Sequence, residues 1–298
     1  MAVGDAVGTT VEFMPPGSFH PVTDMVGGGP FNLEPGEWTD DTSMALCLAE
    51  SLVESGGFNA KDQMTRYVRW YREGYWSSTG RCFDIGNNTS RALTAFEETG
   101  DLFSGSTSSS AASNGSVMRL APAPLYFANQ PRCAIDYSGM SSRITHGAAQ
   151  AVDACRYLGG LIVSATQGAS KEDILSDRHT PVGSWEDFGP WHPEIEEVAS
   201  GGFKRRNPPE IAGTGYAVST IEAALWGFFN SESFEEGLLK VVNLGDDADT
   251  TGAIFGQLAG CYYGLGGIPE KWTRRIARLE EVVDLAERLH GASLSART

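Results

Sequence analysis

The sequence is poor in positive charge. Its 298 residues include 22 Lys and Arg against 38 Asp and Glu, which gives a formal net charge of −16 at pH 7. A chain with this balance is not suited to binding nucleic acid or an anionic membrane by electrostatic attraction. A small anionic ligand remains compatible with the charge if backbone amides, an arginine or a metal ion hold it locally.

Paired cysteines and long apolar runs are also missing. The five cysteines are scattered, none forms a Cys-x-x-Cys pair and their number is odd, which is not typical of a disulfide framework. No apolar stretch is long enough to span a membrane. The first residues show neither the basic region nor the apolar segment of a secretory signal. We therefore expect a cytoplasmic protein with reduced thiols, and we expect it to be a monomer.

Strand signals are scarce, whereas helix signals recur. The one candidate strand is residues 22–26, within a stretch rich in Gly and Pro. Apolar residues recur at helical spacing in several segments. The clearest are residues 45–52, where Thr42 or Ser43 is the expected cap, and residues 64–71, 145–167, 218–228 and 269–290.

The remaining pattern favours one all-α domain. Residues 178–213 are irregular and predict a long loop around one short helix. About ten helices are expected in all, with no alternation of strand and helix and no solenoid repeat. The sequence therefore predicts a single, compact, all-α domain over residues 1–298.

The densest chemistry lies between residues 245 and 251. Asp246, Asp247 and Asp249 fall within four residues, and two threonines follow at once. Like charges this close are costly unless a cation or strong hydrogen bonds offset the repulsion. Carboxylate and hydroxyl oxygens suit magnesium, manganese or calcium. A solvated loop that caps the next helix is the simpler alternative, but it explains one Asp and one Thr rather than three carboxylates.

A second stretch, Thr39-Asp40-Asp41-Thr42, has the same ingredients. If the two loops face one site, they bring four carboxylates together, and two divalent cations would neutralise them. Metals paired in this way typically lie about 3.5–4 Å apart. The two loops lie at opposite ends of the chain, so a shared site would require a single domain.

Glycines recur near both acidic stretches. Gly4 and Gly8 lie on one helical face of the first segment, as do Asp5 and Glu12. After the second acidic stretch, glycines recur at every fourth residue from 252 to 264. Such a stripe lets a neighbouring backbone approach closely.

Five short motifs occur in a fixed order along the chain. They are Gly4-Asp5-Ala6-Val7-Gly8 leading to Glu12, Thr39-Asp40-Asp41-Thr42, Asn114-Gly115-Ser116-Val117-Met118-Arg119, Thr145-His146-Gly147 and Gly245-Asp246-Asp247-Ala248-Asp249-Thr250. Each motif alone is weak, but the five together are specific. The set resembles the ADP-ribosylglycohydrolase family, and in particular its bacterial dinitrogenase-reductase-activating glycohydrolase branch.

The resemblance implies an orthogonal multi-helix fold with a central binuclear centre of Mg²⁺ or Mn²⁺. It implies hydrolysis of an α-glycosidic bond between ADP-ribose and an acceptor on a protein or small molecule, with ADP-ribose as product. The implied metal ligands are Thr39, Asp40, Asp41, Asp247, Asp249 and Thr250. Glu12 and Asp41 are the implied catalytic residues. Asn114, Gly115 and Ser116 are implied to hold the diphosphate and His146 the ribose side of the ligand, while Asp246 is implied to be structural.

The residues themselves leave alternatives open. Glu12 is also compatible with a solvated surface position, and His146 with a packed or capping histidine. Arg119 is equally suited to a buried acid and to phosphate. For function, ADP-ribosyl-arginine hydrolysis is the prediction. Another two-metal hydrolase, acting on a phosphoester or a small ADP-ribose conjugate, and a non-enzymatic ADP-ribose-binding relative are the alternatives.

Overall fold

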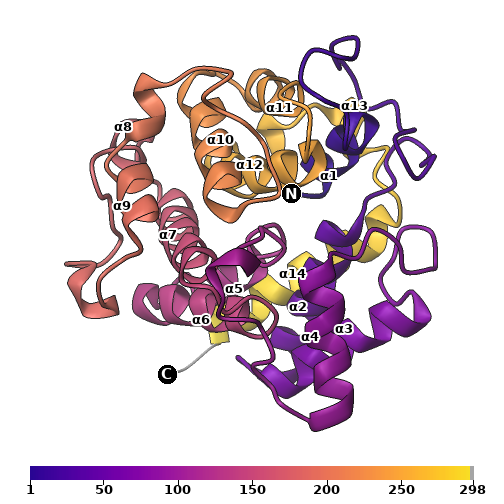
Figure 1. Ribbon diagram of the computed structural model, residues 1–298, viewed down its shortest axis with the longest axis vertical. Helices are drawn as coiled ribbons and strands as arrows, with labels where there is room; N and C mark the ends of the chain where they lie inside the picture. The colour runs from indigo at the N-terminus through magenta and orange to yellow at the C-terminus, as the bar shows by residue number, and fades with distance from the viewer. Residues whose placement is uncertain (296–298) are drawn as a thin grey trace.

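The computed structural model describes residues 1–295, which fold into α-helices and short 3₁₀ helices without a β-sheet (Figure 1). The predicted all-α class is therefore confirmed. The α-helices are α1 (Ala2–Gly8), α2 (Asp40–Ser55), α3 (Ala60–Glu73), α4 (Asn87–Thr99), α5 (Pro122–Tyr126), α6 (Pro131–Arg143), α7 (Ala149–Thr166), α8 (Lys171–Ile174), α9 (Pro193–Ala199), α10 (Ala217–Phe229), α11 (Phe234–Val242), α12 (Ala248–Tyr263), α13 (Glu270–Thr273) and α14 (Leu279–Ser295).

The candidate strand at residues 22–26 is wrong. Val22 satisfies its backbone groups with a side chain instead of a second strand. Its amide donates to Oδ1 of Asn243 at 2.7 Å, and its carbonyl accepts from Nδ2 of the same residue at 2.9 Å. Asn243 therefore ties this loop to the segment that leads into the second acidic stretch.

Helix α12 lies in the middle of the fold, where it packs against α1, α7, α10 and α11 (Figure 1). Every residue from Ala248 to Ala259 is buried, as expected for a helix covered on all sides. The second acidic stretch leads directly into this helix. Its carboxylates are thus carried at the buried start of a helix in the core.

The predicted close approach at the glycine stripe is confirmed for α1 against α12. A Cβ atom added to Gly4 would lie 2.0 Å from the carbonyl oxygen of Gly252, and one added to Gly252 would lie 2.5 Å from that of Gly4. Further along, a Cβ on Gly8 would lie 2.4 Å from Cα of Asp249. The stripe is not in contact along its whole length, because nothing lies within 4 Å of such an atom at Gly260.

Helix α2 begins earlier than the sequence indicates. Its N-cap is Thr39 rather than Thr42 or Ser43, and the Thr39 side chain makes no capping bond. Asp40 and Asp41 are therefore the first two residues of the helix. The hydroxyl of Thr39 makes its contacts with carboxylates instead, as described below.

Other departures have identifiable causes. The predicted helix over 269–290 is two helices, α13 and α14, separated where Arg278 adopts φ +51°. Helices α5 and α6 are not among the predicted helices. Each begins with a proline, Pro122 and Pro131, a residue that is tolerated in the first turn of a helix but breaks a helix interior. Helix α11 was also missed, although Ser233 caps it by accepting a bond from the amide of Glu236.

The positions of the remaining predicted helices agree with the structure, although residues 1–295 form fourteen α-helices against the expected number of about ten. The helix expected over 145–167 is α7, and the short helix expected within residues 178–213 is α9, accompanied there by two 3₁₀ turns. Among residues 1–295, no helix combines the length and the apolar character needed to cross a membrane.

Candidate metal centre

The two acidic stretches meet at the starts of two helices. Asp40 and Asp41 form the first turn of α2, Asp249 lies in the first turn of α12, and Asp247 is the N-cap of α12. Helix N-termini carry a partial positive charge that favours nearby carboxylates, by about 0.3–1 kcal/mol each. This is less than the cost of burying several like charges together. Helix ends alone therefore do not account for the cluster.

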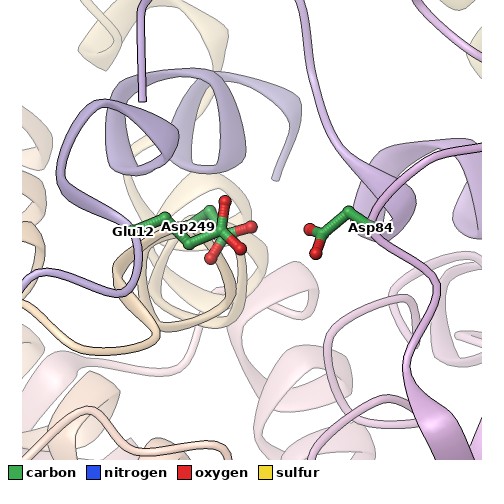
Figure 2. Close-up of side chains that lie close together, drawn as sticks. All are labelled: Glu12, Asp84 and Asp249. Atoms are coloured by element: carbon green, nitrogen blue, oxygen red, sulfur yellow. The ribbon is translucent and has the colours of Figure 1, made fainter. Parts of the chain in front are cut away.

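Two more carboxylates come from other parts of the chain. Glu12 follows the 3₁₀ helix η1 (Thr9–Val11), and Asp84 precedes α4. One carboxylate oxygen each from Glu12, Asp84 and Asp249 lie within 4.8 Å of one another. Figure 2 shows Asp84 pointing across the site toward the other two side chains. These three residues form an arrangement that a metal ion could occupy.

Asp84 is a site residue that the sequence reasoning missed. It has no acidic neighbour in the sequence, so no local cluster marks it. Its backbone has φ +58°, a conformation that Asp tolerates better than most residues. The available signal was its position two residues before Gly86, the N-cap of α4.

Thr39 lies at the centre of the carboxylates. Its hydroxyl oxygen is 3.1 Å from an oxygen of Asp5, 3.3 Å from Oδ2 of Asp41 and 3.1 Å from Oδ2 of Asp249. Thr250 similarly places its hydroxyl 3.3 Å from Asp41. A hydroxyl has one proton and can donate to only one of these oxygens at a time. The remaining oxygen–oxygen contacts are repulsive unless positive charge lies among them.

Asp5 was also missed as a structural support of this site. Its carboxylate accepts from the amide and hydroxyl of Thr39, at 2.9 and 3.1 Å, and from the amide and hydroxyl of Thr42, at 3.0 and 2.6 Å. The residue is fully buried. Asp5 thus fixes the start of α2 from α1 and orients the Thr39 side chain.

Burial raises the pKa of each carboxyl in the cluster, and the neighbouring carboxylates raise several further. The pKa of Glu12 is raised to about 10 and that of Asp84 to about 7. Those of Asp40, Asp41 and Asp249 are raised well above the ordinary value. The cause in every case is the cost of holding negative charge away from water and beside like charge.

The donor set fits divalent cations. Oε2 of Glu12, Oδ1 of Asp41 and Oδ1 of Asp249 are buried and have no hydrogen-bond partner. Buried carboxylate oxygens without a partner cost several kcal/mol unless something binds them. Hard oxygen ligands of this kind are those preferred by magnesium and manganese.

The carboxylates open into a cavity of about 530 Å³, within the range of about 300–1,000 Å³ usual for small-molecule sites. Glu12, Asp40, Asp84 and Asp247 line one part of it. Apart from Arg91, its other walls carry no charged side chain. They combine the apolar Phe13, Ile85 and Met118 with polar residues and glycines, some of them at the start of α4. These polar residues and glycines are Gly86, Asn87, Asn88, Thr89, Ser113, Asn114, Gly115, His146, Gly215 and Thr250.

Three of the four predicted substrate-binding residues line this cavity. Asn114 donates to Oδ2 of Asp247 at 2.8 Å, which connects the two parts of the cavity. Gly115 lies against His146, since a Cβ there would be 2.9 Å from the imidazole ring. Ser116 is placed differently, because its hydroxyl is buried 2.8 Å from that of Ser142 and does not line the cavity.

Asp246 holds the segment that carries Glu12. Its carbonyl accepts from the amide of Phe13 at 2.7 Å, and its amide donates to the carbonyl of Met14 at 2.8 Å. Phe13 and Asp246 both adopt positive φ, +60° and +52°. This pairing of two strained residues joins the N-terminal segment to the second acidic loop and so sets the position of Glu12 beside Asp249.

These features define an all-helical protein with a buried acidic cleft that fits a metal ion, next to a polar ligand cavity. The chain belongs to the ADP-ribosylglycohydrolase family, whose model matches residues 1–297.

The similarity to known proteins extends over nearly the whole chain. It is 40% identical to ADP-ribosylarginine hydrolase Tri1 of Serratia proteamaculans, over 97% of this chain and 76% of the relative. It is 31% identical to ADP-ribosyl-[dinitrogen reductase] glycohydrolase of Rhodospirillum rubrum, over 93% of this chain and 87% of the relative. A solved structure described as an ADP-ribosylglycohydrolase-related protein complex superposes with a TM-score of 0.85 at 46% identity, covering 98% of this chain and 94% of that one. The family that the five motifs resemble is thereby confirmed.

Proposed function

We propose that this protein is a metal-dependent hydrolase that releases ADP-ribose from ADP-ribosylated arginine by cleaving the α-glycosidic bond. The observation that carries the proposal is the convergence of carboxylates from four separate segments on one cavity, with three of their oxygens buried and unpartnered. A structural role would not require such a costly arrangement.

The choice of arginine as acceptor is supported by relatives. The protein of Serratia proteamaculans and one of Pseudomonas putida, the latter 42% identical over 97% of this chain and 75% of its own, are both named ADP-ribosylarginine hydrolase. The chemistry of the cavity agrees with that choice, because a guanidinium is cationic and is attracted to carboxylates.

The residues that would hold two divalent cations, Mg²⁺ or Mn²⁺, are Thr39, Asp40, Asp41, Asp247, Asp249 and Thr250. Asp84 is added to this set because its carboxylate faces Glu12 and Asp249. When bound, the cations supply positive charge that can hold ribose hydroxyls and lower the pKa of a water molecule. Hydrolysis of a glycosidic bond needs both an oriented water and a source of protons.

Glu12 is assigned the proton-transfer role. Its carboxylate lines the cavity, and Oε2 has no partner within the protein. It can therefore orient a water molecule or hold a proton next to the bond that breaks. Asp41 is assigned a role at the reacting sugar, because the hydroxyl of Thr250 contacts its Oδ2 at 3.3 Å while its Oδ1 has no hydrogen-bond partner.

The cavity wall opposite the carboxylates is assigned to the diphosphate. Helix α4 begins there without a side-chain cap, so its first amides remain available to phosphate oxygens. Arg91 lines the same part of the cavity and is exposed. These donors favour the orientation in which the diphosphate lies on this wall and the glycosidic bond lies beside Glu12.

Hydrolysis assays with defined substrates test this proposal. Purified protein should release ADP-ribose from an ADP-ribosyl-arginine peptide when magnesium is present and should not do so in excess chelator. Metal-dependent turnover of a generic phosphoester without turnover of the peptide would favour a different two-metal hydrolase. Binding of ADP-ribose without turnover of either substrate would favour the non-enzymatic alternative. The cytoplasmic location, the monomeric state and the single domain over residues 1–298 stay predictions.

A further inference from the structure

Arg119 is buried beneath the cavity and uses its guanidinium to hold other polar groups. Nη2 donates to the hydroxyl of Thr145 at 2.6 Å, and Nη1 donates to the carbonyl of Gly115 at 3.1 Å. The ring of Tyr67 lies 4.7 Å from the guanidinium carbon. Arg119 therefore binds neither of the partners that its sequence position left open, a buried acid or a ligand in the cavity.

A guanidinium can only donate hydrogen bonds, and this fixes the direction of the bonds beyond it. Because Thr145 accepts from Arg119, its own hydroxyl proton is directed to Nδ1 of His146, which lies 2.8 Å away. A neutral imidazole that accepts at Nδ1 must carry its proton on Nε2. Nε2 lies 2.9 Å from the hydroxyl of Ser113 and donates to it.

Burial and the charge of Arg119 agree with a neutral His146. Together they lower the pKa of His146 to about 3, with burial the larger cause. Both ring nitrogens are already occupied by protein groups. His146 therefore affects a ligand through Ser113 rather than through a nitrogen of its own.

The hydroxyl of Ser113 accepts a second bond. Nδ2 of Asn88 donates to it at 2.8 Å, and the same nitrogen donates to the carbonyl of Ala111 at 3.1 Å. A carbonyl can only accept, so the bond to Ala111 fixes which end of the Asn88 amide faces Ser113. Both lone pairs of the Ser113 oxygen are then used, and its proton has to be donated to a further group.

Ser113 lines the cavity together with the start of α4 and Arg91. We propose that the Ser113 hydroxyl binds the substrate by donating its hydrogen to a phosphate oxygen, and that Arg119, Thr145 and His146 are positioning residues that fix this direction. Phosphate oxygens only accept hydrogen bonds, so a hydroxyl constrained to donate matches them. This inference rests on the proposed function, because it takes the ADP-ribosyl diphosphate as the ligand.

Calorimetric titration of Ser113 variants tests the contact. A hydrogen bond to a charged group is worth enough that Ser113→Ala should weaken ADP-ribose binding about 10- to 100-fold. Ser113→Thr keeps the hydroxyl and should retain most of the affinity. Ser110→Ala is the matched control, since Ser110 lies in the same loop, is exposed and does not line the cavity.

The ligand series identifies the group that is bound. ADP keeps the diphosphate, so its affinity should fall by the same factor as that of ADP-ribose in Ser113→Ala, whereas adenosine should bind both proteins equally. A loss confined to ADP-ribose would overturn the assignment to the diphosphate and place the contact on the distal ribose.

The relay, meaning the chain of hydrogen bonds from Arg119 through Thr145 and His146 to Ser113, is tested separately at Thr145. Thr145→Val removes the hydroxyl that donates to Nδ1 of His146, and Thr145→Ser retains it. Nitrogen-15 NMR of the histidines, of which the chain has five, should show His146 as the neutral Nε2–H form in wild type and Thr145→Ser, and a changed signal in Thr145→Val. ADP-ribose affinity should fall in Thr145→Val and recover in Thr145→Ser. An Nδ1–H form in the wild type would overturn the relay.

The outcomes separate this inference from the proposed function. If wild-type protein hydrolyses the ADP-ribosyl-arginine peptide but Ser113→Ala binds ADP-ribose as tightly as wild type, only the inference is wrong. If wild-type protein neither binds ADP-ribose nor hydrolyses the peptide, the proposed function and the inference are both wrong.

Discussion

Replacing Gly8 by Ala should impair both stability and catalysis, because Gly8 sets the distance between α1 and the helix that carries Asp249. Its backbone angles, φ −71° and ψ −35°, are ordinary for any residue. The glycine is needed for space, since a Cβ would lie 2.4 Å from Cα of Asp249 and from the carbonyl oxygen of Ala248. Real Cβ contacts are not closer than 3.0 Å, so the two segments must separate by about 0.6 Å.

Two effects follow from this separation. Overpacking a tight interface costs about 1–3 kcal/mol, and each kcal/mol lowers the melting temperature of a protein this large by about 2–4 °C. Glu12 lies four residues after Gly8, so a shift of Gly8 would also move Glu12 relative to Asp249. A displacement of about 1 Å at reacting groups can cost about 100-fold in rate, so we expect a loss in kcat of about tenfold for this smaller shift.

Thermal unfolding and peptide turnover should be measured for Gly8→Ala and for Gly260→Ala. The second change lies on α12 itself, where nothing occupies the space of the added atom. It should leave turnover unchanged and raise stability by up to about 1 kcal/mol, as for Ala in place of Gly within a helix. If Gly8→Ala matches wild type in both measurements, the close packing of α1 on α12 does not set the geometry of the site.

Three further changes test the carboxylates. In excess chelator the melting temperature should fall as the pH rises from about 5 to about 8. The reason is that a buried acid with a raised pKa, such as Asp84 with a pKa of about 7, stabilises the fold while it is protonated and loses that contribution as it ionises. Magnesium or manganese should reduce this loss, and zinc should replace them poorly in turnover assays. Glu12→Gln should lower kcat by about 10²–10⁴-fold while calorimetry still detects ADP-ribose. Asp5→Asn should lower the melting temperature and weaken Mn²⁺ binding in a titration. The Asp5 carboxylate accepts four hydrogen bonds, whereas an amide has only one acceptor oxygen. Unchanged Mn²⁺ affinity would contradict the supporting role of Asp5.

The sequence predicts those parts of the site that local composition marks. Asp40 and Asp41 are adjacent, and Asp247 and Asp249 are two residues apart, so repulsion between neighbours in the chain is visible without coordinates. The spacing of the glycines after the second acidic stretch predicts the close approach of another backbone, and α1 makes that approach to α12.

Asp84 and Ser113 show why the rest could not be predicted. Asp84 is a single acid in an irregular segment, and only the packing of α4 brings it to face Glu12 and Asp249. Ser113 follows a stretch of Ser, Thr and Ala that has the composition of a mobile linker. Its role depends on donors from Asn88 and His146, which lie 25 and 33 residues away in the chain. Contacts between distant segments leave no pattern in either sequence neighbourhood.

The electrostatics of the cavity determine how a ligand of this class can enter. One wall presents carboxylates that, without cations, would repel a diphosphate. The other presents uncapped amides at the start of α4, the exposed Arg91 and a serine hydroxyl constrained to donate. An ADP-ribosyl group reversed in the cavity would place its phosphates against Glu12 and its ribose hydroxyls against donors. Under the proposed function, the donors at the start of α4 and the Ser113 hydroxyl therefore favour the orientation in which the diphosphate lies on their wall and the glycosidic bond lies beside Glu12.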